Sequence, residues 1–231
     1  RIIEAIESAR RHALAQTSDD IVRLGFVPSV GRWLVPFFLD SFRESSSAAR
    51  FELRANFARA LYRLLRGDVN HAAFLTAPRP GEPDLAWRHL LDERFVVAVP
   101  PGHRLSGRRR VDVSEIADER FIAFSHATEL RGAVDALLQR TGTHVDVVFE
   151  SGELDTMRGL VAAGLGIAIV PESAASAADL QQLALTPSTS RPIGIAWGAP
   201  GRRSDAGEPF LDHARTHPFR RRDQLAPTDA A

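Results

Sequence analysis

The chain has 231 residues, which is enough to bury one sizeable core or the cores of two small lobes. Its 29 basic residues balance 29 acidic ones. This neutral net charge argues against a protein that binds nucleic acid by itself, because neutralising the phosphates needs a basic surface. The absence of cysteine excludes disulfides and thiolate metal sites and fits a cytoplasmic protein, and no apolar run is long enough to span a membrane.

The chain begins at Arg1 without a methionine, and no basic-then-apolar signal segment opens it. We therefore expect a piece of a longer protein. Residues 1–16 predict a polar helix with a thin heptad stripe, formed by Ile2, Ile6, Ala9 and Ala13. Two alternatives remain open: this helix packs on the surface of its own domain, or it is the end of a longer helix that belongs to another domain.

From residue 21 onward, apolar runs of strand length alternate with amphipathic segments of helix length. The predicted strands cover residues 21–27, 51–55, 72–75, 90–99, 121–124, 145–149, 167–170 and 193–197. The predicted helices cover residues 32–43, 58–66, 130–140, 156–163 and 209–217, with a helical turn at 113–117. The connections are short, so this order predicts an α/β protein with mostly parallel sheets flanked by helices.

Residues 156–171 carry the clearest local pattern in the chain. A helix is predicted over 156–163, and Gly164 stands where a left-handed cap is wanted, because a residue without Cβ adopts that conformation at little cost. The run 167–170 is continuously apolar, as in strands that are buried on both faces of a sheet. Pro171 is predicted to end this strand.

The stretches between these elements are interpreted from their composition. Residues 28–31 predict a tight turn, and Gly67 is predicted to cap the helix that precedes it. The arginine run at 108–110 is interpreted as a solvated charge run in a loop. Residues 173–190 show only weak patterning.

The strand at 193–197 comes late and has no partner nearby in the sequence. We therefore predict that the chain returns there to its first lobe, so that two crossing segments join two lobes. The predicted division is residues 18–98 and 189–218 for the first lobe, 99–188 for the second and 219–231 for a disordered tail. Such a two-lobed protein binds its ligand between the lobes, at the carboxyl ends of strands.

The sequence contains no nucleophile elbow and no phosphate-binding loop of the Walker type. His213 and His217 stand four residues apart on a predicted helix, but without a third ligand they are interpreted as surface histidines. Ser125 and His126 are adjacent, whereas a nucleophile and its base are normally brought together from separate segments. We therefore predict no catalytic residue, no metal and no cofactor, and a protein that binds a small molecule without converting it.

Small polar residues follow successive predicted strands, and each of these loops leads into a helix. The candidate binding residues in these loops are Ser29, Val30, Asn56, Phe57, Ser125, His126, Thr128, Ser151 and Gly152. A helix N-terminus offers free N–H groups and a favourable dipole to an anion such as a carboxylate. Serine is also a favoured helix cap, so capping and ligand binding both remain open for Ser29, Ser125 and Ser151.

Six segments, in order along the chain, resemble the effector-binding domain of LysR-type transcriptional regulators. The most specific one is 153–173, which contains GLVAAGLGIAIVPES. The others are 21–36 (IVRLGFVPSVGRWLVP), 92–105 (DERFVVAVPPGHRL), 111–124, 191–197 (RPIGIAW) and 209–214.

This resemblance implies a two-lobed fold like that of type 2 periplasmic binding proteins, with an inducer cleft between the lobes. The nine loop residues named above match the positions that line the inducer in this family. Residues 1–17 would be the end of a linker helix that dimerises. The implied partners are a small carboxylate or aromatic acid, a second or further copies in a dimer or tetramer, and promoter DNA through a winged helix-turn-helix outside this chain; no membrane partner is implied.

The chain also departs from the family pattern. Phe57 stands where many members have a small hydroxyl residue, and Asn70 and His71 replace the usual aspartate and apolar residue after Gly67. Two other functions share parts of the pattern. A solute-binding protein of a transporter has the same fold, and a small α/β enzyme would need a catalytic set. An upstream helix-turn-helix would favour the regulator, and a signal peptide would favour the transporter.

Overall fold

The computed structural model describes residues 21–45, 49–77, 85–173, 180–198 and 207–219, and the predicted N-terminal helix and C-terminal tail lie outside these ranges. The chain divides into two compact units. The first unit contains residues up to Arg88 and Ile195–His217, and the second contains His89–Gly194, with Pro218 and Phe219 at the end of the described chain. The chain enters the second unit within β4 (Leu85–Val99) and returns to the first within β10 (Ser190–Gly198).

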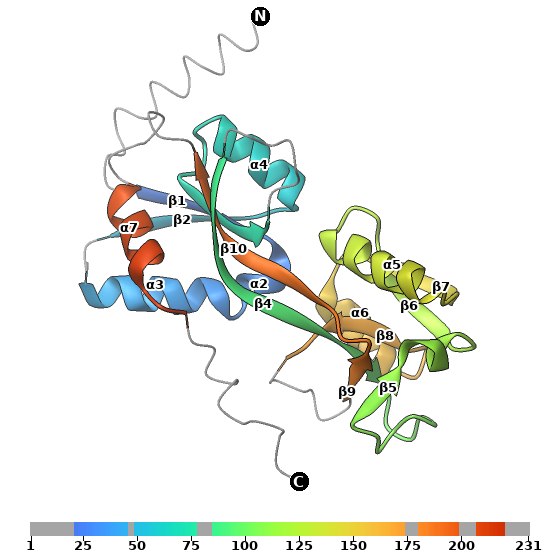
Figure 1. Ribbon diagram of the computed structural model, residues 1–231. Helices are drawn as coiled ribbons and strands as arrows, with labels where there is room; N and C mark the ends of the chain where they lie inside the picture. The colour runs from blue at the N-terminus through green and yellow to red at the C-terminus, as the bar shows by residue number, and fades with distance from the viewer. Residues whose placement is uncertain (1–20, 46–48, 78–84, 174–179, 199–206, 220–231) are drawn as a thin grey trace, which may run out of the picture. The chain divides into compact units, whose positions relative to one another are not determined.

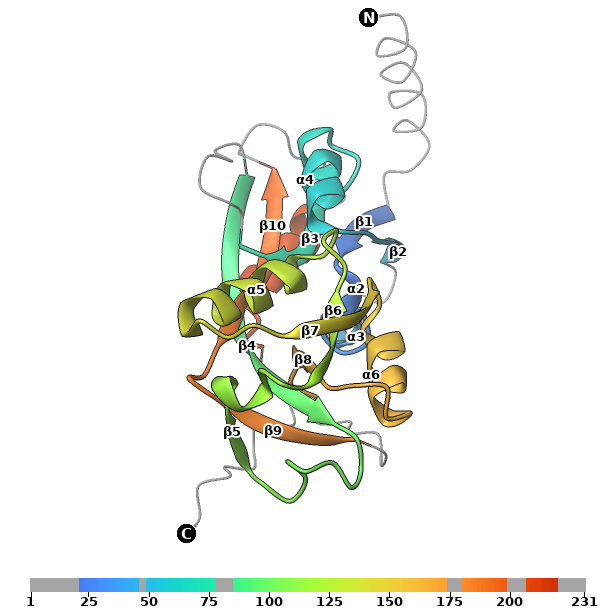
Figure 2. The same ribbon diagram turned by 90° about the vertical axis from the view of Figure 1, so that its right-hand side faces the viewer.

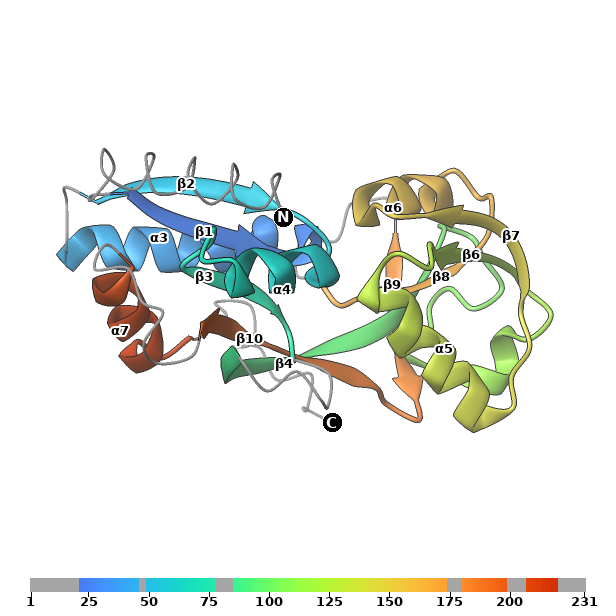
Figure 3. The same cartoon turned by 90° about the horizontal axis from the view of Figure 1, so that it is seen from above.

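The first unit is built on parallel strands around β1 (Ile21–Phe26), which pairs with β2 (Arg50–Ala55) on one side and β3 (Ala72–Thr76) on the other. Helices α3 (Leu34–Ser45) and α7 (Glu208–Thr216) lie side by side against one face, and α4 (Ala58–Arg66) lies on the opposite face (Figures 1 and 3). Buried rings join α3, β3 and α7, with Phe38 stacked on Phe74 at 5.1 Å and Phe42 edge-on to Phe210 at 5.3 Å. Aromatic burial of this kind is the main source of stability in such a core.

The second unit mixes parallel and antiparallel strands. β6 (Arg120–Phe124) and β7 (Asp146–Ser151) pair in parallel, with α5 (Glu129–Thr141) and α6 (Leu154–Ala162) flanking them (Figure 2). β4 pairs antiparallel with both β8 (Ala168–Pro171) and β9 (Gln181–Thr186), and β9 pairs in parallel with β5 (Arg110–Asp112). The α/β fold class is confirmed, but the antiparallel pairings of β4 were not predicted.

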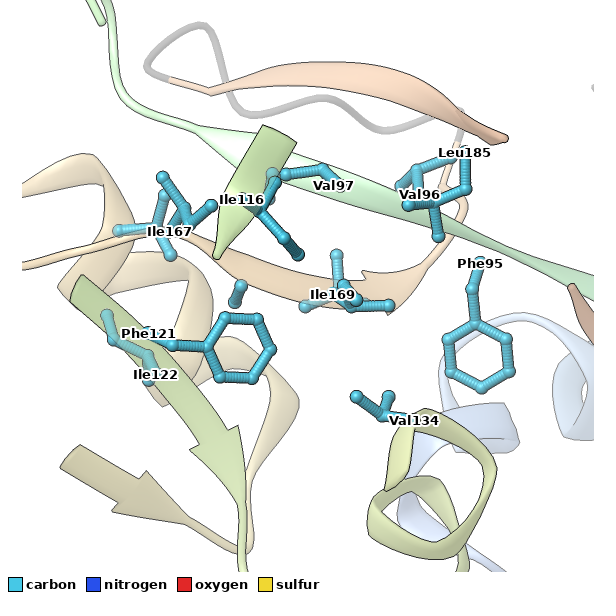
Figure 4. Close-up of a cluster of buried hydrophobic side chains, with 14 of the residues drawn as sticks. Phe95, Val96, Val97, Ile116, Phe121, Ile122, Val134, Ile167, Ile169 and Leu185 are labelled. Carbon is cyan, nitrogen blue, oxygen red and sulfur yellow. The ribbon is translucent and has the colours of Figure 1, made fainter. Parts of the chain in front are cut away.

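Side chains from most of these elements meet in the core of the second unit (Figure 4). The run 167–170 is at most 1% exposed at every position, as its continuous apolar sequence predicts. Ile169 lies between Phe121 of β6 and Phe95 of β4 in this view. Burial of a chain segment on every side requires apolar residues without alternation, which is why this segment was the clearest strand in the sequence.

Two glycines cap helices in different conformations. Gly164 adopts the predicted left-handed conformation, with φ at 76°. Gly67 is the C-cap of α4, as predicted, but its φ is −89°, and the next residue, Asp68, takes the left-handed conformation with φ at 54°. Aspartate tolerates this conformation better than most residues with a side chain.

Three elements differ from the predicted pattern. Residues 28–31 form the one-turn helix α2 (Pro28–Gly31) rather than only a turn. β9 lies inside the weakly patterned stretch 173–190. β5 begins at the last residue of the arginine run 108–110, so that run is not wholly a loop. Short helical pieces and short strands carry little periodicity, which explains why the sequence pattern did not predict these elements.

His71, one of the two residues that depart from the family pattern, contacts Arg23 of β1 through both ring nitrogens. The backbone N–H of Arg23 donates to Nδ1 at 3.2 Å, and Nη2 of the Arg23 guanidinium lies 2.8 Å from Nε2. Burial and the Arg23 charge together lower the pKa of His71 to about 4. Protonation would direct a second ring N–H at these donors and add a positive charge beside Arg23, so the folded protein keeps His71 neutral.

We predict that the free energy of unfolding falls as the pH is lowered from about 6.5 to about 4. In this window the unfolded chain binds a proton at His71 and the folded chain does not, which costs roughly 1 to 3 kcal/mol of stability. Chemical denaturation of the parent and of His71→Asn across this range measures the effect. The variant should show a much flatter profile, and an equally steep loss in both proteins would contradict the assignment.

Candidate functional site

The first group of candidate residues meets at one edge of the first unit. Because β1 and β2 are parallel, their carboxyl ends lie together, as the two arrowheads in Figure 3 show. The backbone N–H of Asn56 donates to the carbonyl of Phe26 at 3.0 Å, which ties the loop after β2 to the end of β1. Ser29 and Val30 follow β1 within α2, and Phe57 follows Asn56 at the start of α4. The predicted residues of this unit are therefore brought together.

These four residues differ in what they expose. The side chain of Val30 is fully buried, so only its backbone is available to a ligand. Asn56 is exposed, and its Oδ1 accepts the backbone N–H of Phe57 at 2.9 Å. The ring of Phe57 is 36% exposed at the N-terminus of α4. The carbonyl of Ser29 accepts the indole N–H of Trp33 at 3.2 Å, so Trp33 supports this edge although the sequence analysis did not single it out.

The second group meets at one edge of the second unit. β6 and β7 are parallel, so Ser125 and Ser151 stand at neighbouring strand ends. The backbone N–H of Ser125 donates to the carbonyl of Ser151 at 2.8 Å. His126 is exposed in the loop between β6 and α5, and Gly152 is partly exposed after β7. The structure thus brings together the predicted residues of this unit as well.

The hydroxyl groups at this edge have three different roles. Thr128 is the N-cap of α5, where its Oγ1 accepts the N–H of Arg131 at 3.2 Å and donates to the carbonyl of Ser125 at 3.0 Å. Ser151 Oγ accepts the N–H of Glu153 at 3.1 Å and so shapes the turn before α6. The hydroxyl of Ser125 makes no hydrogen bond to the part of the chain that the structure describes. Among the three hydroxyls at this edge, that of Ser125 is thus the one without a hydrogen bond to the described residues.

Arg131 ties this edge together and was missed by the sequence analysis. Its side chain is 14% exposed, and Nη1 donates to the carbonyl of Phe124 at 2.8 Å and to Glu150 at 2.7 Å. Its Nε donates to Asp135 at 2.8 Å. The hydrogen bond from Arg131 lowers the pKa of Glu150. Because two carboxylates already neutralise this guanidinium, its main effect is to join β6, α5 and β7.

The two C-terminal histidines lie against a neighbouring helix rather than on open surface. His213 is partly buried, stacks on His217 at 4.7 Å and contacts Ser41 Oγ of α3 through Nε2 at 2.8 Å. Ser41 Oγ also donates to the carbonyl of Phe38 at 3.2 Å. The interpretation as surface histidines is thus incomplete, because His213 helps to dock α7 on α3.

Two further searches covered only the described ranges. In those ranges, no group of three or more side chains of histidine, aspartate or glutamate is arranged to hold a metal ion. The helices within the same ranges include none that is long and apolar enough to cross a membrane.

Comparison with known proteins agrees with this architecture. Residues 15–218 match the family model described as the LysR substrate binding domain. Over 212 residues the chain is 34% identical to the uncharacterized HTH-type transcriptional regulator YybE of Bacillus subtilis (strain 168), covering 89% of this chain and 70% of that protein.

Two solved structures show the same fold. The effector binding domain of QuiR in complex with shikimate matches with a TM-score of 0.79 at 24% identity, covering 86% of this chain and 99% of that one. The BenM effector binding domain with its effector benzoate matches with a TM-score of 0.73 at 25% identity, covering 84% and 90% of the two chains. The fold like that of type 2 periplasmic binding proteins is thereby confirmed.

Two α/β units joined by two strands, with polar loops at the strand ends, are the architecture of the effector-binding domains that the chain matches. The chain belongs to the family of LysR substrate-binding domains, and it is the effector-binding regulatory domain of a LysR-type regulator. Because domains of this family are non-enzymatic, the prediction that the chain is not an enzyme is confirmed. Its relatives are transcriptional regulators, which decides against the transporter alternative.

The hydrogen bonds of this edge predict that two substitutions change the free energy of unfolding by different amounts. Thr128→Ala removes the cap of α5 and should lower the free energy of unfolding by about 1 kcal/mol, whereas Thr128→Ser should keep most of it. Ser125→Ala removes a hydroxyl that makes no hydrogen bond to any residue the structure describes, and it should change stability by less than about 0.5 kcal/mol. Urea unfolding measures both. A loss at Ser125 as large as that at Thr128 would show that Ser125 has a structural role.

Proposed function

We propose that this domain senses a small carboxylate or aromatic acid through the polar loops at the strand ends of both units. The observation that carries the proposal is the hydroxyl of Ser125, which lies ahead of the N-terminus of α5 and makes no hydrogen bond within the described part of the chain. A helix N-terminus favours an anion through its N–H groups and its dipole. Shikimate and benzoate, the ligands of QuiR and BenM, both carry a carboxylate.

The charges of the second unit support recognition by neutral donors. Asp135 and Glu150 already neutralise Arg131, so this guanidinium has no excess charge to offer an acid. An effector carboxylate would instead be held by the Ser125 hydroxyl, by backbone N–H groups and by the exposed His126. The exposed ring of Phe57 in the first unit adds a flat apolar surface, which favours an effector that contains a ring.

Effector binding would act by selecting one arrangement of the domain. A ligand shifts such an equilibrium only through its different affinity for the two arrangements. The selected arrangement would change the geometry of the oligomer and thus the spacing of DNA-binding domains outside this chain. Such a regulator would work in the cytoplasm, where it meets promoter DNA.

Self-association is the second part of the proposal, and two exposed strand edges support it. In the described part of the chain, β2 pairs only with β1 and β7 only with β6. Three consecutive apolar residues of β7 are exposed, and they are Val147 at 40%, Val148 at 37% and Phe149 at 47%. Edge strands with exposed apolar side chains invite pairing with another chain.

The two edges carry net charges of opposite sign. In β2, Glu52 pairs with Arg54, and the strand also contains the exposed Arg50 and Leu53, the latter 44% exposed. β7 contains the exposed Asp146 and Glu150 on either side of its apolar residues. We therefore propose that the β7 edge of one copy meets the β2 edge of another copy, giving a dimer from which a tetramer can also be built.

A thermal-shift screen with shikimate, benzoate and related acids tests the sensing proposal. A true effector should raise the melting temperature in a saturable way, because it binds the native state. Ser125→Ala should then weaken the affinity by about tenfold or more, since a hydrogen bond to a charged group is lost. Ser190→Ala, which changes an exposed serine outside these loops, is the matched control. Saturable binding that Ser125→Ala leaves unaltered would contradict the proposed site.

Sedimentation of Phe149→Asp tests the proposed edge contact. Placing a charge on an apolar edge that is covered in the oligomer should shift the protein towards monomers at micromolar concentration. Gln139→Asp adds the same charge on an exposed position of α5 and should leave the assembly unchanged. If Phe149→Asp sediments like the parent protein, the β7 edge is not the contact, whereas ligand binding remains a separate question.

A further inference from the structure

A fully desolvated ion pair joins the two strands that carry the chain between the units. Arg191 of β10 donates from Nε and Nη2 to the same oxygen of Glu93 in β4, at 2.7 and 2.6 Å. The side chains of Arg191 and Glu93 are only 5% and 1% exposed. By contrast, the neighbouring pair of Arg94 and Glu172 is 67% and 42% exposed.

Both charges occupy positions that the strand pattern assigns to apolar residues. In β4, Leu91 and Phe95 are buried on either side of Glu93, whereas Asp92 and Arg94 between them are exposed. Since side chains alternate along a strand, Glu93 stands in the middle of an inward-facing apolar row. On β10, Arg191 continues the inward row of Ile193 and Ile195 in the same way.

Stability does not account for this choice of residues. Removing two charges from water costs about as much as their mutual attraction returns, and well-packed apolar residues at such a place are often as stable or more so. Two apolar side chains would also complete both inward rows without any desolvation. The ion pair must therefore be explained by something that apolar residues do not provide.

Apolar residues do not specify the register of the two strands, and an ion pair does. The Phe95 N–H donates to the carbonyl of Thr189 at 3.0 Å, so β4 and β10 run antiparallel, with Glu93 opposite Arg191. A slip by two residues would keep every inward side chain inward but would place Thr189 or Ile193 opposite Glu93. Each such register leaves a buried charge without its partner, which is strongly unfavourable.

We infer that Glu93 and Arg191 form a register lock, a pair of positioning residues that holds β4 and β10 in a single alignment. These two strands are the places where the chain passes from unit to unit. Their register therefore sets which residue of each strand leaves the second unit. The inference does not depend on which effector the domain binds.

Amide hydrogen exchange, together with urea unfolding, separates a register lock from a merely stabilising pair. Glu93→Gln should lower the unfolding midpoint strongly, because Arg191 keeps a buried charge without its partner. The double variant Glu93→Leu with Arg191→Met should recover a midpoint close to that of the parent. Its Phe95 amide should nevertheless exchange at least about tenfold faster, because slipped registers are no longer penalised.

Two further variants complete the test. Exchanging the two charges, as Glu93→Arg with Arg191→Glu, should restore slow exchange at Phe95, and Arg94→Gln in the neighbouring exposed pair should leave it slow. Slow parental exchange at Phe95 in the stable Leu–Met variant would overturn the inference. If that variant does not fold, the double variant Glu93→Gln with Arg191→Gln decides the question, because two neutral amides keep polar side chains at both positions but remove the penalty of separating buried charges. Faster exchange at Phe95 in this variant than in the parent supports the lock, and unchanged exchange refutes it.

Discussion

Parallel pairing of β1 with β2 and of β6 with β7 is the constraint on which the candidate site depends. Parallel strands end at the same edge, so loops that are far apart in the sequence become neighbours without any direct contact between their side chains. Short backbone hydrogen bonds then keep them there, from Asn56 to Phe26 in the first unit and from Ser125 to Ser151 in the second. The candidate site is polar because it is formed by the loops that follow the ends of these strands, and those loops contain polar residues.

The fold class and the family could be read from the sequence, because they rest on long, strongly patterned segments such as 153–173. The grouping of the polar loops also followed, since it needs only strand order and direction. What each hydroxyl does could not be read in the same way. Thr128 caps α5 while Ser125 does not, and both residue types favour such positions equally. The two residues are distinguished only by the position of the Arg131 N–H, which Thr128 accepts and Ser125 does not.

Residues that act through long-range contacts were the hardest to foresee. Arg131 lies in the first turn of α5, where the helix dipole disfavours a cation. It joins α5 to β7 through its hydrogen bond to Glu150, 19 positions later. Glu93 and Arg191 are 98 positions apart, and each looks like a surface residue in its own segment. The strand β9 escaped because its burial alternates over only six residues. A local pattern does not contain a distant partner.

Amide NMR of the domain during titration with an acid that raises its melting temperature is the most direct test of effector sensing at these loops. Our account predicts saturable shifts for the amides of Ser125 and Gly152 in the second unit and of Asn56 and Phe57 in the first. Saturable binding that shifts amides elsewhere and leaves these four unchanged would contradict the account and place the effector at another site.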